Sequence, residues 1–524
     1  MLTFMSSLST IQLTPIQLSL LISRVEAVCR EMGVVLRRAS FSPNIKDRLD
    51  FSCALFDAQG RLYAQAAHIP VHLGSMAWAM QDIVDAVQWR EGDMLVLNDP
   101  YKGGTHLPDV TVISPVFVDE RLVSFVANRA HHANIGSDTP GSMPVSRRLD
   151  EEGFLISPSM LVQAGRLNED LLSQLSAIEG LDVTGDFAAQ MSANRTGESR
   201  LKQLITSEGL ASFLPGLEAI NDYGRRIADA ALADIPDGQY AFSDYLDDDG
   251  VGSVDIPLQV TITITGSEVR VDFTGTSPQV AGNLNCPLSV AAAGVIYAFR
   301  CLMPDYTPAC WGSFSGITIH APAGSLLNAR PPAAVAAGNV ETSMRVVDLV
   351  LGALAQAVPD RIPAASQGTM NNVAMGNHQV SPAVRRAWDY YETLAGGHGA
   401  HARSDGFSAT HSHMTNTLNT PAESVEMHFP VRIRRYALRR GSGGAGFHTG
   451  GDGLIREYEF LEPAAVTLLT ERRRYAPWGL AGGTAGQTGR NLLDGTELPG
   501  KCHLQVEAGQ VLCVETPGGG GYGQ

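Results

Sequence analysis

Cysteines are scarce in this sequence, and none is paired at the spacing that small metal-binding domains use. The chain has seven cysteines among its 524 residues, an odd number, and no CxxC pair. This pattern argues against a disulfide scaffold and against a zinc ribbon, and it suits a reducing compartment. We therefore expect a cytoplasmic protein.

Long apolar runs are also missing. No run approaches the roughly 18 residues that a membrane-spanning helix needs, and no small-residue cleavage site follows the short apolar stretch at residues 18–22. Basic residues are outnumbered, with 38 Lys and Arg against 54 Asp and Glu and a formal net charge of −16. Because an acidic chain is a poor partner for phosphate backbones, we expect neither membrane insertion nor nucleic-acid binding.

Several motifs of nucleotide sites and nucleophilic enzymes are absent. The glycine-rich stretch at 441–446 does not match the phosphate-binding GxxxxGK[ST] pattern, and no GxGxxG follows a predicted strand. The sequence has no GxSxG elbow, and no cysteine lies in an obvious nucleophile context. By elimination, metal-assisted hydrolysis is the strongest enzymatic hypothesis.

Histidines are few but clustered. His106 is followed three residues later by Asp109, and His131 and His132 are adjacent about 25 residues further on. A His-x-x-Asp turn with a third ligand from another strand can hold a divalent cation, because imidazole suits Zn, Mn or Fe and a carboxylate compensates charge. The alternative is that the prolines, glycines and aspartates of 99–109 only shape a turn.

Two further polar segments are candidates for chemistry. Asp47 and Asp50 lie just before a predicted strand and could supply a further ligand or the base for a metal-activated water, or they form an ordinary acidic flank. The segment 411–423 is rich in hydroxyls, amides and imidazoles, which are poor core material because each buried polar atom needs a partner. It predicts a polar pocket wall or, alternatively, a well-bonded surface loop; its candidate substrate-binding residues are His411, His413, Asn416 and Glu423.

The composition and periodicity predict an α+β (mixed α/β) fold with several domains. Hydrophobic residues make up 44% of the chain and charged residues 18%, and the length exceeds that of one compact core. We predict an N-terminal α/β region that holds the metal cluster at 1–165, a helical segment at 166–235 and a C-terminal α/β region at 236–524. Within these regions we expect a helix from Thr14-Pro15, short strands around 51–65, 94–97 and 110–113, a hairpin at 260–273, a buried helix at 342–357, and a β-rich last hundred residues with tight glycine turns.

Long and unusual segments of this sequence resemble the hydantoinase B/oxoprolinase family. They run in order from about residue 15 to the C-terminus and include Asn44-Ile-Lys-Asp-Arg-Leu-Asp50, Arg129-Ala-His-His-Ala-Asn-Ile-Gly136 and Gly338-Asn-Val-Glu-Thr342. The other matching segments are 68–76, 98–109, 140–144, 411–417, 477–483 and 516–523. Asn134 and Ser137 depart from the Asp and Gly that the family pattern has after the His-His pair.

The resemblance implies a division of labour between two subunits. A hydantoinase A-like partner would bind ATP and phosphorylate the substrate, and this chain would bear the metal and open a cyclic imide or lactam. Carried over to this sequence, the metal ligands would be His106, Asp109 and His131, with His132 as the alternative and an aspartate of the Asp47/Asp50 pair nearby. The resemblance thus implies a hetero-oligomer in which this chain itself binds no nucleotide.

Two other functions are compatible with the same segments. The chain could be a subunit of an ATP-dependent ketone carboxylase that uses the same metal site, or a structural subunit without its own chemistry. The short chain and the Asn44–Arg48 segment resemble the hydantoinase branch more than the carboxylase branch. A carboxylase needs bicarbonate for ATP turnover, whereas a hydrolase does not.

Overall fold

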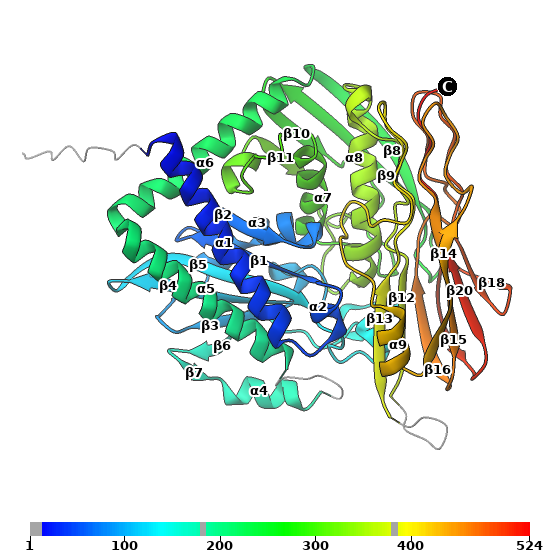
Figure 1. Cartoon of the computed structure of the whole chain (residues 1–524), viewed down its shortest axis with the longest axis horizontal. Coiled ribbons are helices and arrows are strands. Elements are labelled where there is room, and N and C mark those ends of the chain that lie inside the picture. Colours follow the sequence, from blue (N-terminus) through cyan, green and yellow to red (C-terminus); the bar gives the residue numbers. More distant parts are fainter. Residues whose placement is uncertain (1–12, 179–184, 379–385) are drawn as a thin grey trace, which may run out of the picture.

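The computed structural model describes residues 13–178, 185–378 and 386–524 (Figure 1). Residues 179–184, which belong to the predicted helical segment, lie outside this part of the chain. Helices and several separate sheets alternate along the sequence, so the predicted mixed α and β fold is confirmed. The domain boundaries at 165 and 235 stay a prediction.

The N-terminal region is built on a seven-stranded antiparallel sheet. Its strand order is β2-β1-β5-β4-β3-β6-β7. The strands are β1 (Phe51–Asp57), β2 (Leu62–Ala67), β3 (Met94–Leu97), β4 (Asp109–Val118), β5 (Arg121–His131), β6 (Ser159–Gln163) and β7 (Arg166–Leu167).

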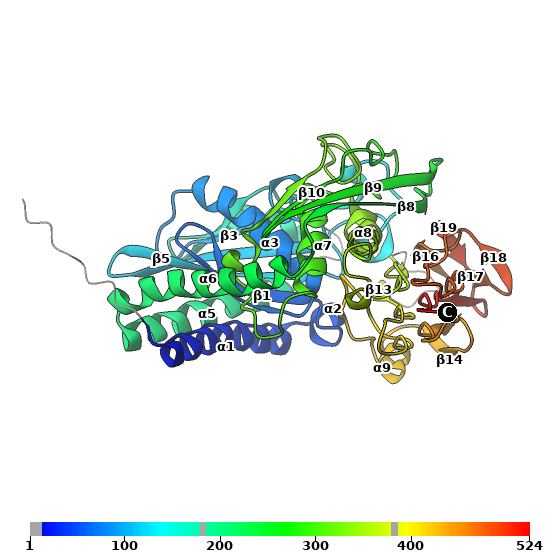
Figure 2. The same ribbon diagram turned by 90° about the horizontal axis from the view of Figure 1, so that it is seen from above.

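Helices cover both faces of this sheet (Figures 1 and 2). Along β1, Phe51, Cys53 and Leu55 pack in one core with helices from one side, whereas Ala54 and Phe56 pack in another core with helix α3. This alternation is the period-2 pattern of a strand buried on both faces. The helices of this region are α1 (Pro15–Ala39), α2 (Pro43–Lys46), α3 (Pro70–Asp85), α4 (Glu169–Ser176), α5 (Asp186–Glu208) and α6 (Leu210–Ala233).

Helix α1 begins where the sequence predicts it. Thr14 is the N-cap and forms a capping box with Gln17, and Pro15 occupies the first turn, where its missing N–H costs nothing. The buried stripe includes Leu21, Val25 and Met32. The predicted helix and its buried face are therefore confirmed.

A second, four-stranded sheet and two buried helices form the middle of the molecule. The predicted hairpin is confirmed in the pairing of β9 with β10, and the predicted buried helix corresponds to α8. A π-helical turn, Gly338–Thr342, leads directly into α8. The elements are β8 (Gly238–Asp248), β9 (Val254–Thr265), β10 (Glu268–Asp272), α7 (Leu288–Arg300), β11 (Ile317–His320) and α8 (Ser343–Leu354).

The C-terminal region is rich in strands, as the sequence predicts. It contains a four-stranded sheet in the order β13-β12-β16-β19 and a five-stranded sheet in the order β14-β15-β20-β17-β18. The elements are β12 (Asn372–Asn377), β13 (Trp388–Thr393), α9 (Ala422–His428), β14 (Val431–Arg439), β15 (Gly453–Phe460), β16 (Ala464–Leu469), β17 (Arg490–Leu493), β18 (Thr496–Leu498), β19 (Lys501–Val506) and β20 (Val511–Glu515).

Many C-terminal glycines serve close backbone packing rather than turns. Gly519 donates its N–H to Gly451 O at 2.9 Å, and Gly451 donates to His398 O at 2.8 Å, so three distant segments lie backbone to backbone. A Cβ atom added at Gly519 would lie 1.9 Å from the carbonyl oxygen of His398. These glycines are therefore needed because the backbones lie too close together for a Cβ atom. The sequence pattern, in contrast, predicts tight turns.

Substituting Gly519 with alanine is expected to destabilise the C-terminal region. The added methyl group meets a backbone oxygen that cannot rotate away, and overpacking of this kind costs about 2–3 kcal/mol of unfolding free energy. Denaturant unfolding of Gly519→Ala would measure the loss, with Gly500→Ala as control because its nearest atom, Thr470 O, lies at 3.1 Å. Equal stability of Gly519→Ala and the wild type would contradict this packing.

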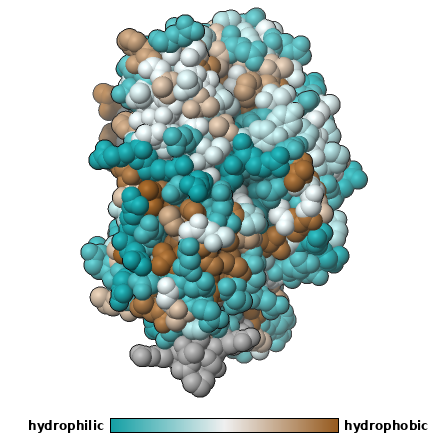
Figure 3. Space-filling model, turned by 90° about the vertical axis from the view of Figure 1, so that its right-hand side faces the viewer, coloured by the Kyte–Doolittle hydropathy of each residue, from teal (hydrophilic) through white to brown (hydrophobic). Residues whose placement is uncertain are grey.

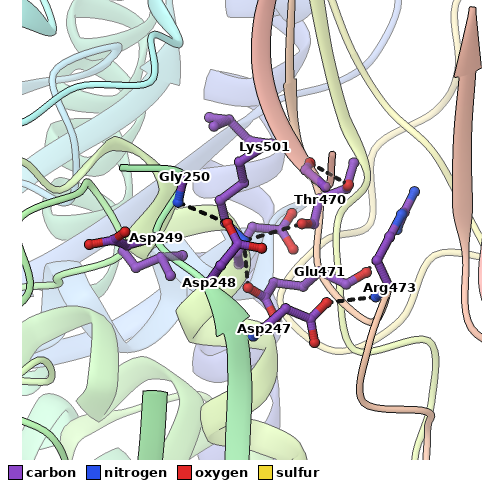
Figure 4. A network of polar contacts seen from close by, with 12 residues as sticks. Asp247, Asp248, Asp249, Gly250, Thr470, Glu471, Arg473 and Lys501 are labelled. Carbon is purple, nitrogen blue, oxygen red and sulfur yellow. Dashed lines mark hydrogen bonds and ion pairs between the residues drawn. The ribbon is translucent and has the colours of Figure 1, made fainter. Parts of the chain in front are cut away.

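A buried polar network joins the C-terminal region to the end of β8 (Figure 4). Lys501 Nζ lies 2.6 Å from Glu471 Oε1, and both side chains are fully buried. Glu471 Oε2 accepts the backbone N–H of Asp247 at 3.0 Å, and Asp247 Oδ2 accepts the N–H of Arg473 at 2.6 Å. Arg345 of α8 contacts Glu471 at 3.2 Å, so charges from the middle of the molecule and from the C-terminal region meet here.

The structure also shows the state of the cysteines and the character of the helices. All seven cysteines lie in the described residues and are free thiols. Among the helices that the structure describes, none combines the length and the apolar composition that a membrane crossing requires.

Candidate metal centre

Three predicted ligands meet at one end of the seven-stranded sheet. Asp109 is the first residue of β4 and His131 is the last residue of β5, and the two are direct partners in the antiparallel register. His106 lies one turn before Asp109, whose N–H donates to His106 O at 3.1 Å. The β4–β5 hairpin therefore brings residues from two strands and a turn to a single point.

The potential ligand atoms of these residues lie within 4.8 Å of one another. His106 Nε2 is 3.3 Å from Asp109 Oδ1, and the side chains of both residues are almost completely buried. Three atoms, His106 Nε2, Asp109 Oδ1 and His131 Nε2, are buried without a hydrogen-bond partner in the described structure. Buried polar atoms without partners are costly, so their convergence marks a place for a further group.

The second nitrogen of His106 indicates what that group is. His106 Nδ1 lies 3.2 Å from Ala336 O, and a carbonyl can only accept, so Nδ1 carries the proton. In the neutral imidazole, Nε2 then presents a lone pair toward the Asp109 carboxylate. Two acceptors that face each other in a buried site need a proton or a metal ion between them, and the donor set of two imidazoles and one carboxylate fits a divalent transition metal.

The other ligand side chains are also held by neighbours. Asp109 Oδ2 accepts hydrogen bonds from Thr105 Oγ1 at 2.6 Å and from Asn339 Nδ2 at 3.3 Å. His72 Nε2 lies 3.4 Å from the same oxygen. His131 Nδ1 lies 3.2 Å from the side-chain amide of Asn44. Outer contacts of this kind orient metal ligands and fix their tautomers.

The charges at the centre shift the pKa values of its side chains. Burial alone would raise the pKa of Asp109, but His106 and His72 outweigh it and hold the pKa well below its usual value. Burial lowers the pKa of His131 well below its usual value, assisted by the charge of His106. For His106, burial is outweighed by the Asp109 carboxylate, which raises the pKa. The field of Asp109 thus attracts a positive charge to this point.

An aromatic ring covers one face of His131. Tyr391 of β13 stacks on the imidazole with a centroid distance of 4.8 Å and an interplanar angle of 1°. The guanidinium of Arg48 lies over the Tyr391 ring at 4.8 Å, and Arg48 donates to Tyr391 O at 3.1 Å. The C-terminal region thereby closes over the centre that the N-terminal sheet supplies.

The remaining N-terminal candidates differ in burial and in the groups that they contact. Asp50 is buried, its carbonyl accepts the N–H of His131 at 3.0 Å, and its pKa is raised by burial and lowered in part by Arg48. Asp47 ends α2 and is half-buried. His132 points elsewhere, because its Nε2 donates to Gln190 Oε1 at 2.9 Å and its ring contacts Phe187.

The predicted polar segment 411–423 lies only partly at the candidate metal centre. Leu418 N donates to Arg48 O at 3.0 Å and Val71 N donates to Met414 O at 3.3 Å, so the loop passes beside the segments that carry Asp50 and His72.

The four candidate substrate-binding residues of the segment 411–423 have different environments. Burial lowers the pKa of His411 to about 3. His413 Nε2 pairs with buried Asp348 at 2.9 Å. Asn416 and Glu423 are exposed.

Sequence reasoning missed several residues that contact the ligands. In the sequence His72 stands out only as a neighbour of His68. In the structure the ring of His68 packs on Phe51, whereas His72 Nε2 lies 3.4 Å from Asp109 Oδ2. Asn339 belongs to the segment 338–342 that carries the family resemblance, but nothing local connects it to Asp109, 230 residues away. Tyr391 has no local signal at all.

Comparisons with known proteins agree on one family. A family model described as hydantoinase B/oxoprolinase matches residues 14–524. 5-Oxoprolinase 1 of Arabidopsis thaliana is 41% identical over 546 residues, which cover 97% of this chain and 42% of that protein. A protein of Pseudomonas sp. (strain NS671), named as the candidate B subunit of a D-/L-hydantoinase, is 33% identical, with 98% of this chain and 90% of that protein covered. The chain thus spans about two-fifths of the length of the 5-oxoprolinases that it matches.

Two solved structures share the fold. The ATP-dependent caprolactamase from Pseudomonas jessenii superimposes with a TM-score of 0.90 at 28% identity, covering 98% of this chain and 91% of that one. A nucleotide-free acetone carboxylase superimposes with a TM-score of 0.87 at 18% identity, covering 97% and 76%, which shows a common fold. With the family model matching from Thr14 to the C-terminus, the chain belongs to the hydantoinase B/oxoprolinase family.

Proposed function

We propose that this chain is the metal-bearing B-type component of an ATP-dependent amidohydrolase. In this proposal it opens a cyclic imide or lactam, of the hydantoin or 5-oxoproline type, after a partner subunit has phosphorylated the substrate. The observation that carries the proposal is the convergence of three buried, unpartnered ligand atoms of His106, Asp109 and His131. The names of the relatives, which include 5-oxoprolinases and a hydantoinase component, support the class of substrate.

His106, Asp109 and His131 would hold a divalent transition metal such as Zn, Mn or Fe. A bound cation of this kind supplies Lewis acidity, which polarises carbonyl oxygens and lowers the pKa of water. The protein's own contribution is to hold the ligands rigidly: Ala336 O fixes the tautomer of His106, and Thr105 and Asn339 fix the second oxygen of Asp109. Tyr391 covers His131 and excludes water from that face.

A nearby carboxylate would move the proton. Asp50 is the first candidate for the general base, because it is buried next to the His131 backbone and its pKa is raised mainly by burial. A base with a raised pKa is a better proton acceptor near neutral pH. Asp47 is the second candidate, since it lies in the same segment and is partly accessible.

The 411–423 segment would contribute one wall of the substrate site. His411 is well placed for this, because its loop contacts Arg48 and neither ring nitrogen has a hydrogen-bond partner in the described structure. His413 would act through its pair with Asp348, which holds the loop. Asn416 and Glu423 are exposed and would contact the substrate only where a second subunit covers them.

The ATP site would belong to a hydantoinase A-like partner, and the two chains would form a cytoplasmic hetero-oligomer. The 5-oxoprolinase relatives, of which this chain spans about two-fifths, are long enough to contain such a partner within one polypeptide. The C-terminal β region also leaves large apolar side chains exposed, among them Met427, Tyr436 and Phe447. Figure 3 shows hydrophobic patches separated by hydrophilic residues on this side of the molecule, which is compatible with a contact surface of mixed polarity.

A reconstituted complex with a hydantoinase A-like protein tests this proposal. Ring opening of a cyclic amide is expected to require ATP, both chains and the metal, and to proceed without bicarbonate. Product formation and ADP release would be measured together. Turnover by this chain alone would contradict the division of labour, and a strict need for bicarbonate would assign the complex to ketone carboxylation instead.

A further inference from the structure

A buried carboxylate outside the ligand set holds the loop that contacts two of the three ligands. Glu152 is completely buried and lies just after the short turn Leu149–Glu151. Its Oε1 accepts the backbone N–H groups of Val335 and Ala336, both at 2.9 Å, and the hydroxyl of Ser146 at 2.8 Å. One carboxylate oxygen therefore pins two consecutive peptide groups of a loop that is distant in sequence.

The pinned loop reaches the metal centre at two points. Ala336, whose N–H is bound by Glu152, uses its own carbonyl to accept from His106 Nδ1 at 3.2 Å. Three residues later, at the start of the π-helical turn, Asn339 donates to Asp109 Oδ2 at 3.3 Å. A shift of residues 335–339 would therefore disturb His106 and Asp109 together.

We propose that Glu152 is a positioning residue for the metal centre, acting through residues 335–339 on His106 and Asp109. This inference rests on the proposed metal site but adds a residue outside it. The physical basis is that one oxygen fixes two adjacent peptide groups of the loop, and that residues behind metal ligands set the orientation of those ligands. Loss of such residues typically lowers metal affinity about 10- to 100-fold.

Cobalt(II) binding to the full chain tests the inference directly. Co²⁺ reports its ligand geometry in its visible absorption spectrum, so affinity and geometry are read in one titration, without catalytic turnover. Glu152→Ala is expected to weaken Co²⁺ binding about 10- to 100-fold and to alter the spectrum. Glu152→Gln retains an oxygen that can accept the two N–H groups and is expected to bind nearly as tightly as the wild type.

A matched control separates positioning from general loss of stability. Asp93 is also buried and its carboxylate also accepts two backbone N–H groups, those of Ala164 and Arg90, both at 2.7 Å. It precedes β3 at the end of the strand opposite to the metal centre. Asp93→Ala should lose stability comparable to that of Glu152→Ala but keep the Co²⁺ affinity and spectrum of the wild type.

The outcomes for Glu152 and for the metal site itself can be told apart. Should Glu152→Ala not fold, Glu152→Asp keeps the charge and withdraws the oxygen from the loop, and it is expected to weaken Co²⁺ binding while Glu152→Gln does not. Wild-type affinity in Glu152→Asp or Glu152→Ala would overturn the positioning role and leave the metal centre intact. A wild-type chain that binds no Co²⁺ would overturn both.

Discussion

The His131→Ala variant is expected to lose its bound metal and its partner-dependent activity. In the proposed centre His131 would supply one of three buried ligand atoms, and alanine would leave the cation with a carboxylate and one imidazole. Removing groups that merely orient ligands costs about 10- to 100-fold in affinity or activity, so loss of a ligand itself should exceed about 100-fold. Elemental analysis and ATP-dependent ring opening by the reconstituted complex would measure the two losses.

The adjacent histidine provides the control. His132 has nearly the same sequence environment, but its side chain bonds to Gln190 on α5 instead of facing the cluster. His132→Ala should therefore keep its metal and lose only some stability. If His132→Ala released the metal while His131→Ala retained it, the ligand assignment would be off by one residue.

The second large effect is expected on stability, at Lys501. This ammonium group and the Glu471 carboxylate are 2.6 Å apart and fully buried. Breaking a buried ion pair leaves an uncompensated charge and costs about 3–5 kcal/mol. Lys501→Ala should lower the unfolding free energy by about this amount in denaturant titrations, with the C-terminal region loosened from β8 because Glu471 also holds Asp247 N.

Lys202, a partly exposed lysine that also pairs with carboxylates, is the control for that loss. Lys202 lies 2.8 Å from both Glu91 and Glu198, and its side chain is 32% exposed. Since surface ion pairs contribute at most about 1 kcal/mol, Lys202→Ala should be nearly neutral. Similar losses in the two variants would show that burial does not govern the Lys501 pair.

The sequence could place the candidate ligands near one another because part of their signal is local. His106 and Asp109 lie three residues apart on one turn, and the strands that carry Asp109 and His131 are neighbours in sequence and pair in a hairpin. The family resemblance put His131 first and left His132 as the alternative. Only the structure shows which of the two side chains faces His106, because adjacent residues at a strand end point to opposite sides.

The residues around the ligands could not be predicted in the same way. Tyr391 stacks on His131 and Ala336 accepts from His106 across 230 or more residues, and such contacts leave no spacing pattern. The glycine-rich C-terminus shows a related limit. Glycine is favoured both by turns and by close backbone approach, and only the contact between Gly519 and His398 distinguishes them.

The metal content of the purified wild-type chain shows whether His106, Asp109 and His131 form a metal site. We expect a near-stoichiometric amount of Zn, Mn or Fe after exhaustive dialysis, because three buried ligand atoms without hydrogen-bond partners converge at the end of the β4–β5 hairpin. A folded chain that contains no metal and takes up none when Zn, Mn or Fe is supplied would contradict the account, and would return His106, Asp109 and His131 to structural roles.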